Sequence, residues 1–223
     1  MQIIFLCILA VASITHLVSL FFKYGIIHAL SKACLLPLVA AIYIFGTNEV
    51  FLPVILALLF GWLGDIFLVK IKDVRFFRLG LASFLVGHII YIPVILHFAG
   101  SINVIVLAIS LPAALALGIF LYRLIRPSRE MRVLTVIYAS VILVMVISAA
   151  QLFATQGSPF GALVLAGSVC FVVSDTMLAK FTFGTEPRIG QFLVMLTYIA
   201  AQLCIALGLA GFPAGFPSGF PVH

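Results

Sequence analysis

Short polar loops divide the chain into a regular series of long apolar stretches. A helix that crosses a bilayer needs about 20 mainly apolar residues, because each residue adds about 1.5 Å across a hydrocarbon layer of about 30 Å. The sequence therefore predicts an all-α, polytopic membrane bundle that forms one domain over residues 1–210, followed by a flexible tail rich in Gly-Phe-Pro at 211–223. The eight predicted transmembrane helices span about residues 1–22, 24–46, 50–69, 77–98, 102–122, 133–153, 159–179 and 189–210.

The composition excludes a soluble globule. Of the 223 residues, 65% are hydrophobic and 8% are charged, which leaves too little polar surface to cover a water-soluble domain. The net charge of +6 is carried beside apolar stretches, so we expect membrane lipids rather than nucleic acid as partners. The four cysteines lie inside apolar stretches without the spacing of a metal site, so no metal or other cofactor is predicted.

Basic residues fall in alternate loops. With eight helices, eleven of the twelve Lys and Arg residues lie on one side of the membrane, and the twelfth, Lys32, lies inside the second predicted helix. The positive-inside rule then places these loops in the cytoplasm and both termini outside, and we expect the cell (inner) membrane. The eleven residues are Lys23, Lys70, Lys72, Arg75, Arg78, Arg123, Arg126, Arg129, Arg132, Lys180 and Arg188.

One short motif occurs twice at a constant offset. The segment GDIFLVK at 64–70 matches SDTMLAK at 174–180, and RLG at 78–80 matches RIG at 188–190. Because four helices return a chain to the side where it began, these matches predict two parallel four-helix repeats. Chance similarity between apolar segments is the alternative. The predicted repeat halves are about residues 1–100 and 101–210.

A few ionisable residues interrupt the apolar stretches. A charged side chain near the bilayer centre costs at least about 2.5 kcal/mol, so such residues normally face the bundle interior and mark a site. Asp65 and Asp175 each lie about five residues, or roughly 7 Å, from a basic loop. We expect the two carboxyl groups to face each other in one polar pocket that opens toward the cytoplasmic leaflet. The candidate catalytic residues are Asp65 and Asp175, and the candidate binding or supporting residues are Lys32, His88, Tyr91, Tyr138, Ser174, Tyr198 and Gln202.

Several supporting residues also have a structural alternative. Lys32 could stabilise the fold through an ion pair with an aspartate, or it could extend to the nearby surface. His88 could pack between helices. Hydrogen bonds between or within helices are the structural alternative for Tyr138, Ser174, Tyr198 and Gln202.

Two carboxyl groups, a lysine and a histidine in a pocket of low dielectric form a general acid–base set. The sequence contains no GxSxG or HExxH motif and no phosphate-binding glycine loop, which disfavours serine and metal hydrolases. Paired carboxyl groups suit reactions that pass through an oxocarbenium ion, because one donates a proton while the other stabilises positive charge or activates water.

Five motifs follow one another along the chain: SKACLLPL (31–38), GDIFL (64–68), FRLGLASFLVGHIIY (77–91), GSVCFVVSDTMLA (167–179) and YIAAQ (198–202). In this order they resemble the YhhN-like lysoplasmalogenase family of integral membrane proteins. The spacing of Phe77, Gly80, Phe84, His88 and Tyr91, together with the two aspartate motifs, makes the resemblance specific.

The resemblance implies hydrolysis of the vinyl ether bond in lysoplasmenyl-choline or lysoplasmenyl-ethanolamine lipids. Water would be the second substrate, and a fatty aldehyde and a glycerophospho head group would be the products. The alternative is a proton-coupled transporter that uses the same Asp, Lys and His residues. A transporter needs access from both faces, whereas the polar residues concentrate toward the predicted cytoplasmic half, which favours an enzyme open on one side.

Overall fold

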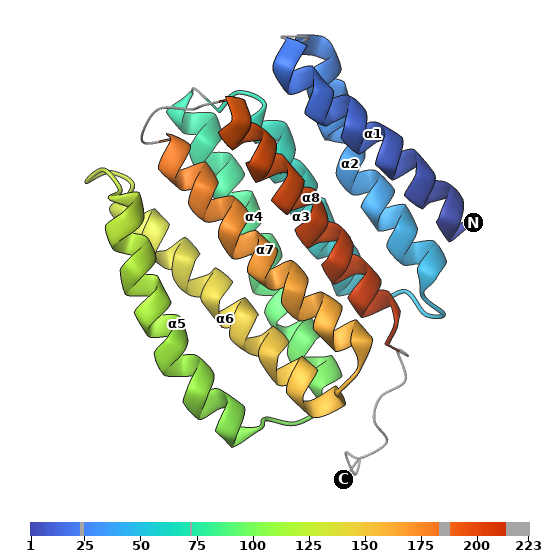
Figure 1. Ribbon diagram of the computed structural model, residues 1–223, viewed down its shortest axis with the longest axis vertical. Coiled ribbons are helices and arrows are strands. Elements are labelled where there is room, and N and C mark those ends of the chain that lie inside the picture. The colour runs from blue at the N-terminus through green and yellow to red at the C-terminus, as the bar shows by residue number, and fades with distance from the viewer. Residues whose placement is uncertain (23–24, 72, 183–187, 213–223) are drawn as a thin grey trace.

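The protein is a bundle of long helices, as the sequence predicts (Figure 1). A computed structural model describes residues 1–22, 25–71, 73–182 and 188–212, and all elements in these ranges are helical. Most of the predicted tail therefore lies outside the described residues. The eight helices are α1 (Gln2–Phe22), α2 (Gly25–Gly46), α3 (Leu52–Leu68), α4 (Val74–Ala99), α5 (Val104–Ile125), α6 (Arg132–Gln156), α7 (Pro159–Thr182) and α8 (Arg188–Ala210).

The helices have the length and composition of membrane spans. Seven of the eight are long and apolar enough to cross a bilayer, and α3, with 17 residues, is at the lower limit of that length. Large apolar side chains are exposed along the outside of the bundle, as at Ile3, Leu115 and Ile137. The chain is therefore a multi-pass helical membrane protein.

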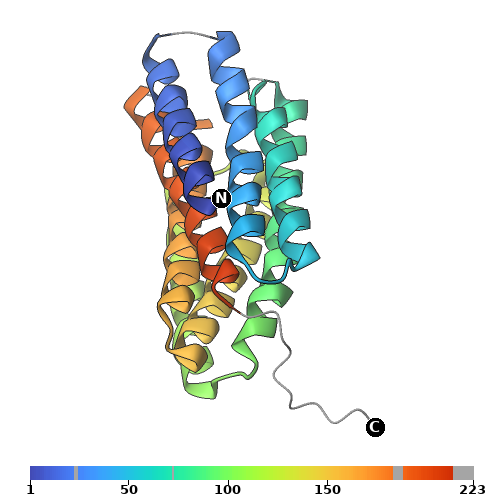
Figure 2. The same cartoon turned by 90° about the vertical axis from the view of Figure 1, so that its right-hand side faces the viewer.

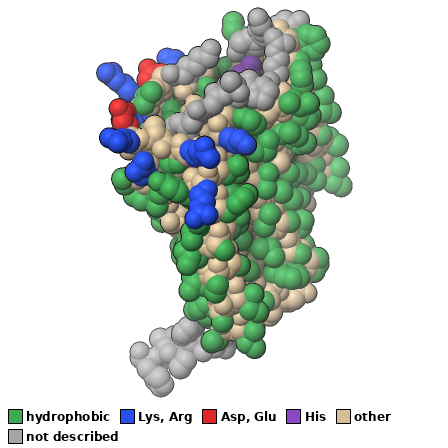
Figure 3. Space-filling model, turned by 60° about the vertical axis from the view of Figure 1, so that its left-hand side comes forward, with side chains coloured by type: hydrophobic (Ala, Val, Ile, Leu, Met, Phe, Trp, Pro, Cys, Tyr) green, Lys and Arg blue, Asp and Glu red, His purple; other side chains and the backbone are tan. Residues whose placement is uncertain are grey.

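Lysine and arginine side chains gather at one end of the bundle, which we call the basic end (Figure 3). It carries the α3–α4 and α5–α6 loops, including Lys70 and Arg126. Lys23 and Lys72, which the topology prediction also uses, lie outside the described residues, and the side chain of Arg188 is not described. The assignment of this end to the cytoplasm stays a prediction.

Helix packing follows the same pattern in both halves of the chain. In the first half α1 packs on α2, α2 on α3 and α3 on α4, and in the second half α5 packs on α6, α6 on α7 and α7 on α8. Figure 2 shows α1 and α2 side by side at the edge of the bundle. The halves meet mainly through two equivalent contacts, α2 with α8 and α4 with α6, and α1 also contacts α8. Two parallel repeats related by an axis along the membrane normal would make this pair of equivalent contacts, although the duplication itself stays a prediction.

Glycines let neighbouring helices approach closely around the centre of the bundle. A Cβ atom on Gly64 would lie 2.6 Å from the Phe84 ring, so the absence of a side chain brings α4 against α3 beside Asp65. In α7, a Cβ on Gly167 would lie 2.8 Å from the carbonyl oxygen of Ala201, which belongs to the backbone of α8. Small residues at helix crossings are typical of membrane proteins.

We expect Gly167→Val to lower the free energy of unfolding by about 1–3 kcal/mol, because overpacking forces two helix backbones apart. Gly118→Val is the matched control, since a Cβ at Gly118 meets only Leu143 Cδ1, at 3.2 Å. Thermal unfolding of both variants in detergent measures the difference. Equal melting temperatures for the two variants would contradict the close α7–α8 contact.

Candidate active site

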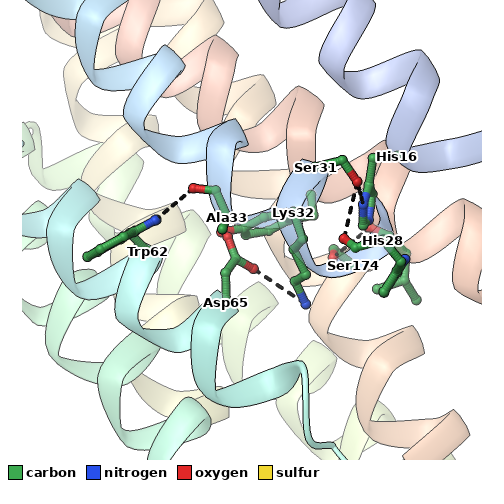
Figure 4. A network of polar contacts seen from close by, with 10 residues as sticks. His16, His28, Ser31, Lys32, Ala33, Trp62, Asp65 and Ser174 are labelled. Carbon is green, nitrogen blue, oxygen red and sulfur yellow. Dashed lines mark hydrogen bonds and ion pairs between the residues drawn. The ribbon is translucent and has the colours of Figure 1, made fainter. Parts of the chain in front are cut away.

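Asp65 is the centre of a buried polar cluster built from three helices. Its side chain is 2% exposed, on the face of α3 that points into the bundle. Tyr198 in α8 donates a hydrogen bond of 2.7 Å from its hydroxyl to Asp65 Oδ2. Lys32 in α2 forms an ion pair with the other oxygen, Nζ to Oδ1 at 3.6 Å (Figure 4). A negative charge on Asp65 therefore has both a cation and a hydroxyl donor as partners.

Asp175 has a different environment in α7. The hydroxyl of Tyr138 in α6 donates a hydrogen bond of 2.5 Å to Asp175 Oδ2. In the part of the chain that the structure describes, Oδ1 has no hydrogen bond and no Lys or Arg contacts the carboxyl group. Asp175 and Tyr138 line a cavity of about 50 Å³, whose walls are otherwise mainly apolar and include Leu68, Phe84 and Leu178. This carboxyl group thus faces an apolar space with one oxygen free.

His88 lies beside Tyr138, in the Asp175 cluster. Its Nδ1 is 2.7 Å from the backbone carbonyl oxygen of Phe84. A carbonyl only accepts, so Nδ1 carries the hydrogen and Nε2 holds a lone pair. Nε2 is buried and has no hydrogen-bond partner among the described residues. The ring stands edge-on to Phe171, with centroids 4.7 Å apart, and to Tyr138, with centroids 5.6 Å apart.

The two carboxyl groups are expected to face each other, but in the structure each one is bound to a tyrosine. They are close enough for their charges to interact, but each accepts a hydrogen bond from its own tyrosine. The ring of Phe171 lies between the clusters, against His88 on one side and Tyr198 on the other, with centroids 4.7 and 5.8 Å apart. Two carboxylates in direct contact would repel each other, and separate tyrosine donors avoid that repulsion.

Among the described residues, the other predicted site residues form no hydrogen bond with either carboxyl group. Tyr91 donates a hydrogen bond of 3.4 Å from its hydroxyl to Gln202 Oε1, which joins α4 to α8. Ser174 donates one of 3.1 Å to the backbone carbonyl oxygen of Val194, which joins α7 to α8. The structure therefore brings together Asp65, Lys32 and Tyr198 in one cluster, and Asp175, Tyr138 and His88 in a second.

Sequence reasoning missed a histidine pair beside Lys32 (Figure 4). The rings of His16 in α1 and His28 in α2 stack with centroids 4.6 Å apart. His16 Nδ1 lies 3.0 Å from Ser31 Oγ, which itself donates to the carbonyl oxygen of His28, while Ser19 Oγ lies 3.3 Å from His28 Nδ1. The three- and four-residue spacing of His28, Ser31 and Lys32 puts them on one helix face, and this was the signal available in the sequence.

A polar pocket of about 130 Å³ adjoins this cluster. Lys32, His28 and Gln191 line it, together with residues near the basic end such as Val69 and Ile71. Two further lining residues, Leu68 and Leu178, also line the apolar cavity at Asp175. These two leucines therefore lie between the polar pocket and the apolar cavity.

The fold and these clusters define a helical membrane protein with two clusters of polar side chains inside its bundle. The chain belongs to the YhhN family, whose model matches residues 26–209. The matched region runs from α2 to α8 and includes both aspartates. No match to the chain was found among curated proteins or among solved structures.

Proposed function

We propose that the protein is an intramembrane hydrolase that cleaves the vinyl ether bond of lysoplasmenyl-choline or lysoplasmenyl-ethanolamine lipids. The observation that carries the proposal is the contrast between two carboxyl groups inside the bundle, of which Asp65 is buried and Asp175 is partly exposed. Asp175 faces an apolar cavity with Oδ1 free, whereas Asp65 is paired with Lys32. One group is thus suited to donate a proton to an apolar substrate, and the other to carry a negative charge.

The reaction adds one water molecule across the vinyl ether. A proton adds to the alkenyl carbon that is not bonded to oxygen, and the electron pair of the double bond forms the new C–H bond. The carbon bonded to oxygen becomes an oxocarbenium ion, to which water adds with loss of a proton. The resulting hemiacetal breaks its bond to the glyceryl oxygen and yields a fatty aldehyde and a glycerol hydroxyl. No net proton is consumed.

We assign the role of proton donor to Asp175. The Tyr138 hydroxyl fixes Oδ2, so a proton on Oδ1 points away from that bond and is available to the alkenyl carbon. The apolar walls of the adjoining cavity suit a hydrocarbon chain, because they offer few polar groups to compete for the proton. Tyr138 is therefore a positioning residue for the donor.

Asp65 stabilises the positively charged intermediate, and His88 activates the attacking water. A carboxylate on Asp65, balanced by Lys32 and Tyr198, stabilises positive charge on the oxocarbenium ion. The free lone pair on His88 Nε2 can accept a hydrogen from the attacking water. The polar pocket at Lys32, His28 and Gln191 offers water a path toward the site from the basic end.

An aldehyde-release assay tests the function. Purified full-length protein is incubated with lysoplasmenyl-choline, with and without a metal chelator, and the aldehyde is quantified. We expect release in both conditions. Release that stops with chelator would overturn the carboxyl mechanism. Protein that is folded but releases no aldehyde, and that instead carries a proton flux across vesicles, would favour the transporter alternative.

Tyr138→Phe should lower turnover by about 10- to 100-fold, because a hydrogen bond to a charged or proton-sharing group contributes about 1.5–3 kcal/mol. Steady-state aldehyde release measures the effect. Tyr91→Phe is the matched control, since its hydroxyl bonds Gln202 and not an aspartate. Equal losses in both variants would mean that the Tyr138–Asp175 bond has no special role.

A further inference from the structure

A long groove runs between α5 and α6. It has a volume of about 520 Å³, and small residues line it, among them Ala114 and Gly118 in α5 and Ala139 in α6. A Cβ at Gly118 would meet only Leu143 Cδ1, at 3.2 Å, so the two helices leave space at this level. Only 6% of the residues in the most apolar stretch of α5 are buried, so this helix packs loosely against the bundle. The groove is open to the surrounding lipid.

Three arginines surround the end of the groove at the basic end. Arg123 and Arg126 end α5 and Arg132 begins α6, and together they line a cavity of about 400 Å³. This cavity joins the groove, because Tyr122 and Arg123 line both. In the described part of the chain no acidic side chain pairs with any of the three arginines. Their uncompensated charge fits a phosphate group, which arginine binds through two parallel hydrogen bonds.

The length of the groove matches one leaflet of a bilayer. Its lining residues in α5 run from Leu111 to Arg123, a distance of about 18 Å at about 1.5 Å per residue. Half of a hydrocarbon layer of about 30 Å is about 15 Å. A lipid with its phosphate on the arginines would therefore lay one hydrocarbon chain along the groove as far as the midplane.

The groove also leads to the candidate active site. Four residues line both the groove and the cavity at Asp175. They lie within about two helical turns of the arginines. A lipid whose phosphate binds the arginines would have the first bonds of its hydrocarbon chain at this level. The four shared residues are Leu121, Ile125, Thr135 and Ala139.

We propose that the α5–α6 groove and its three arginines bind a single-chain phospholipid from the leaflet at the basic end and present the bond next to its head group to Asp175. This inference rests on the proposed hydrolase function for the fate of the lipid. The arginines select lipids that carry a phosphate, and the groove binds the chain.

Binding of an uncleavable lipid tests the inference separately from hydrolysis. The probes are a saturated alkyl-ether analogue of lysophosphatidylcholine, which lacks the vinyl ether, and the matching alkylglycerol, which lacks the phosphate. Both are measured on full-length protein in nanodiscs. The triple variant Arg123→Gln, Arg126→Gln and Arg132→Gln should bind the phosphate-bearing probe on the order of 100-fold more weakly, since each arginine near a membrane surface contributes about fivefold. Its affinity for the alkylglycerol should not change.

Two further variants sharpen the test. Arg129→Gln, in the same loop but outside the lining of the arginine cavity, should bind both probes like the parent protein. Gly118→Phe fills the groove and should weaken both probes. Equal binding by the triple and parent proteins, or an equal loss in Arg129→Gln, would each overturn the proposal. Phosphate-selective binding without aldehyde release would keep the lipid site and overturn only the hydrolase.

Discussion

Asp175→Asn and Asp65→Asn should each lower the rate of aldehyde release by about 10²–10⁴-fold, the range expected when a general acid or its charged partner is removed. An amide keeps the shape of the side chain but can neither donate an acidic proton nor carry a negative charge. Turnover of the purified variants, with folding checked by circular dichroism and gel filtration in detergent, measures the effect.

Asp73→Asn is the matched control for both variants. Asp73 is exposed and caps α4 by accepting a hydrogen bond of 2.9 Å from the backbone N–H of Arg75. Asparagine caps a helix equally well, so this variant should keep full turnover. Near-normal aldehyde release from either Asp65→Asn or Asp175→Asn would refute the assignment of that residue.

Lys32→Met should lower the free energy of unfolding by about 3–5 kcal/mol, because it leaves Asp65 buried at 2% exposure without its cation. The double variant Lys32→Met with Asp65→Asn should recover most of this loss, since no buried charge then remains unpaired. Thermal unfolding in detergent compares the parent protein, both single variants and the double variant.

If Lys32 instead extends to the surface, its loss should leave the melting temperature unchanged, and the double variant should be no more stable than Asp65→Asn alone. That result would mean that the ion pair between Lys32 and Asp65 does not contribute to stability. The comparison uses stability and not turnover, so it stands whatever the substrate of the protein is.

The sequence predicted all eight helices because lipid imposes a simple rule of length and apolarity. The predicted helix ends are less accurate where the prediction places them at charged residues. Helix α4 begins at Val74 and not near 77, because Asp73 caps it, and α7 continues through Lys180 to Thr182. Charged residues beyond the hydrocarbon layer can still be helical, so the ends of the apolar stretches fall short of the helix ends.

The sequence also indicated which residues form the candidate site, because a carboxyl group in an apolar helix is rare. It could not indicate that Tyr198 binds Asp65 and Tyr138 binds Asp175, since these pairings depend on how each helix is rotated in the bundle. Trp62 donates from Nε1 to the backbone carbonyl oxygen of Ala33, next to Lys32 in the chain, and no motif in the sequence indicates this contact. Such contacts need coordinates.

The shortness of α3 has a consequence for the surrounding bilayer. Its 17 residues extend for about 25 Å, less than the thickness of an average hydrocarbon layer. Because Leu59 and Ile66 are exposed to lipid, neighbouring acyl chains must compress to match this helix. The compression brings the polar head-group region nearer to the level of Asp65, so the thickness of the membrane changes how deep this carboxyl group lies below its surface.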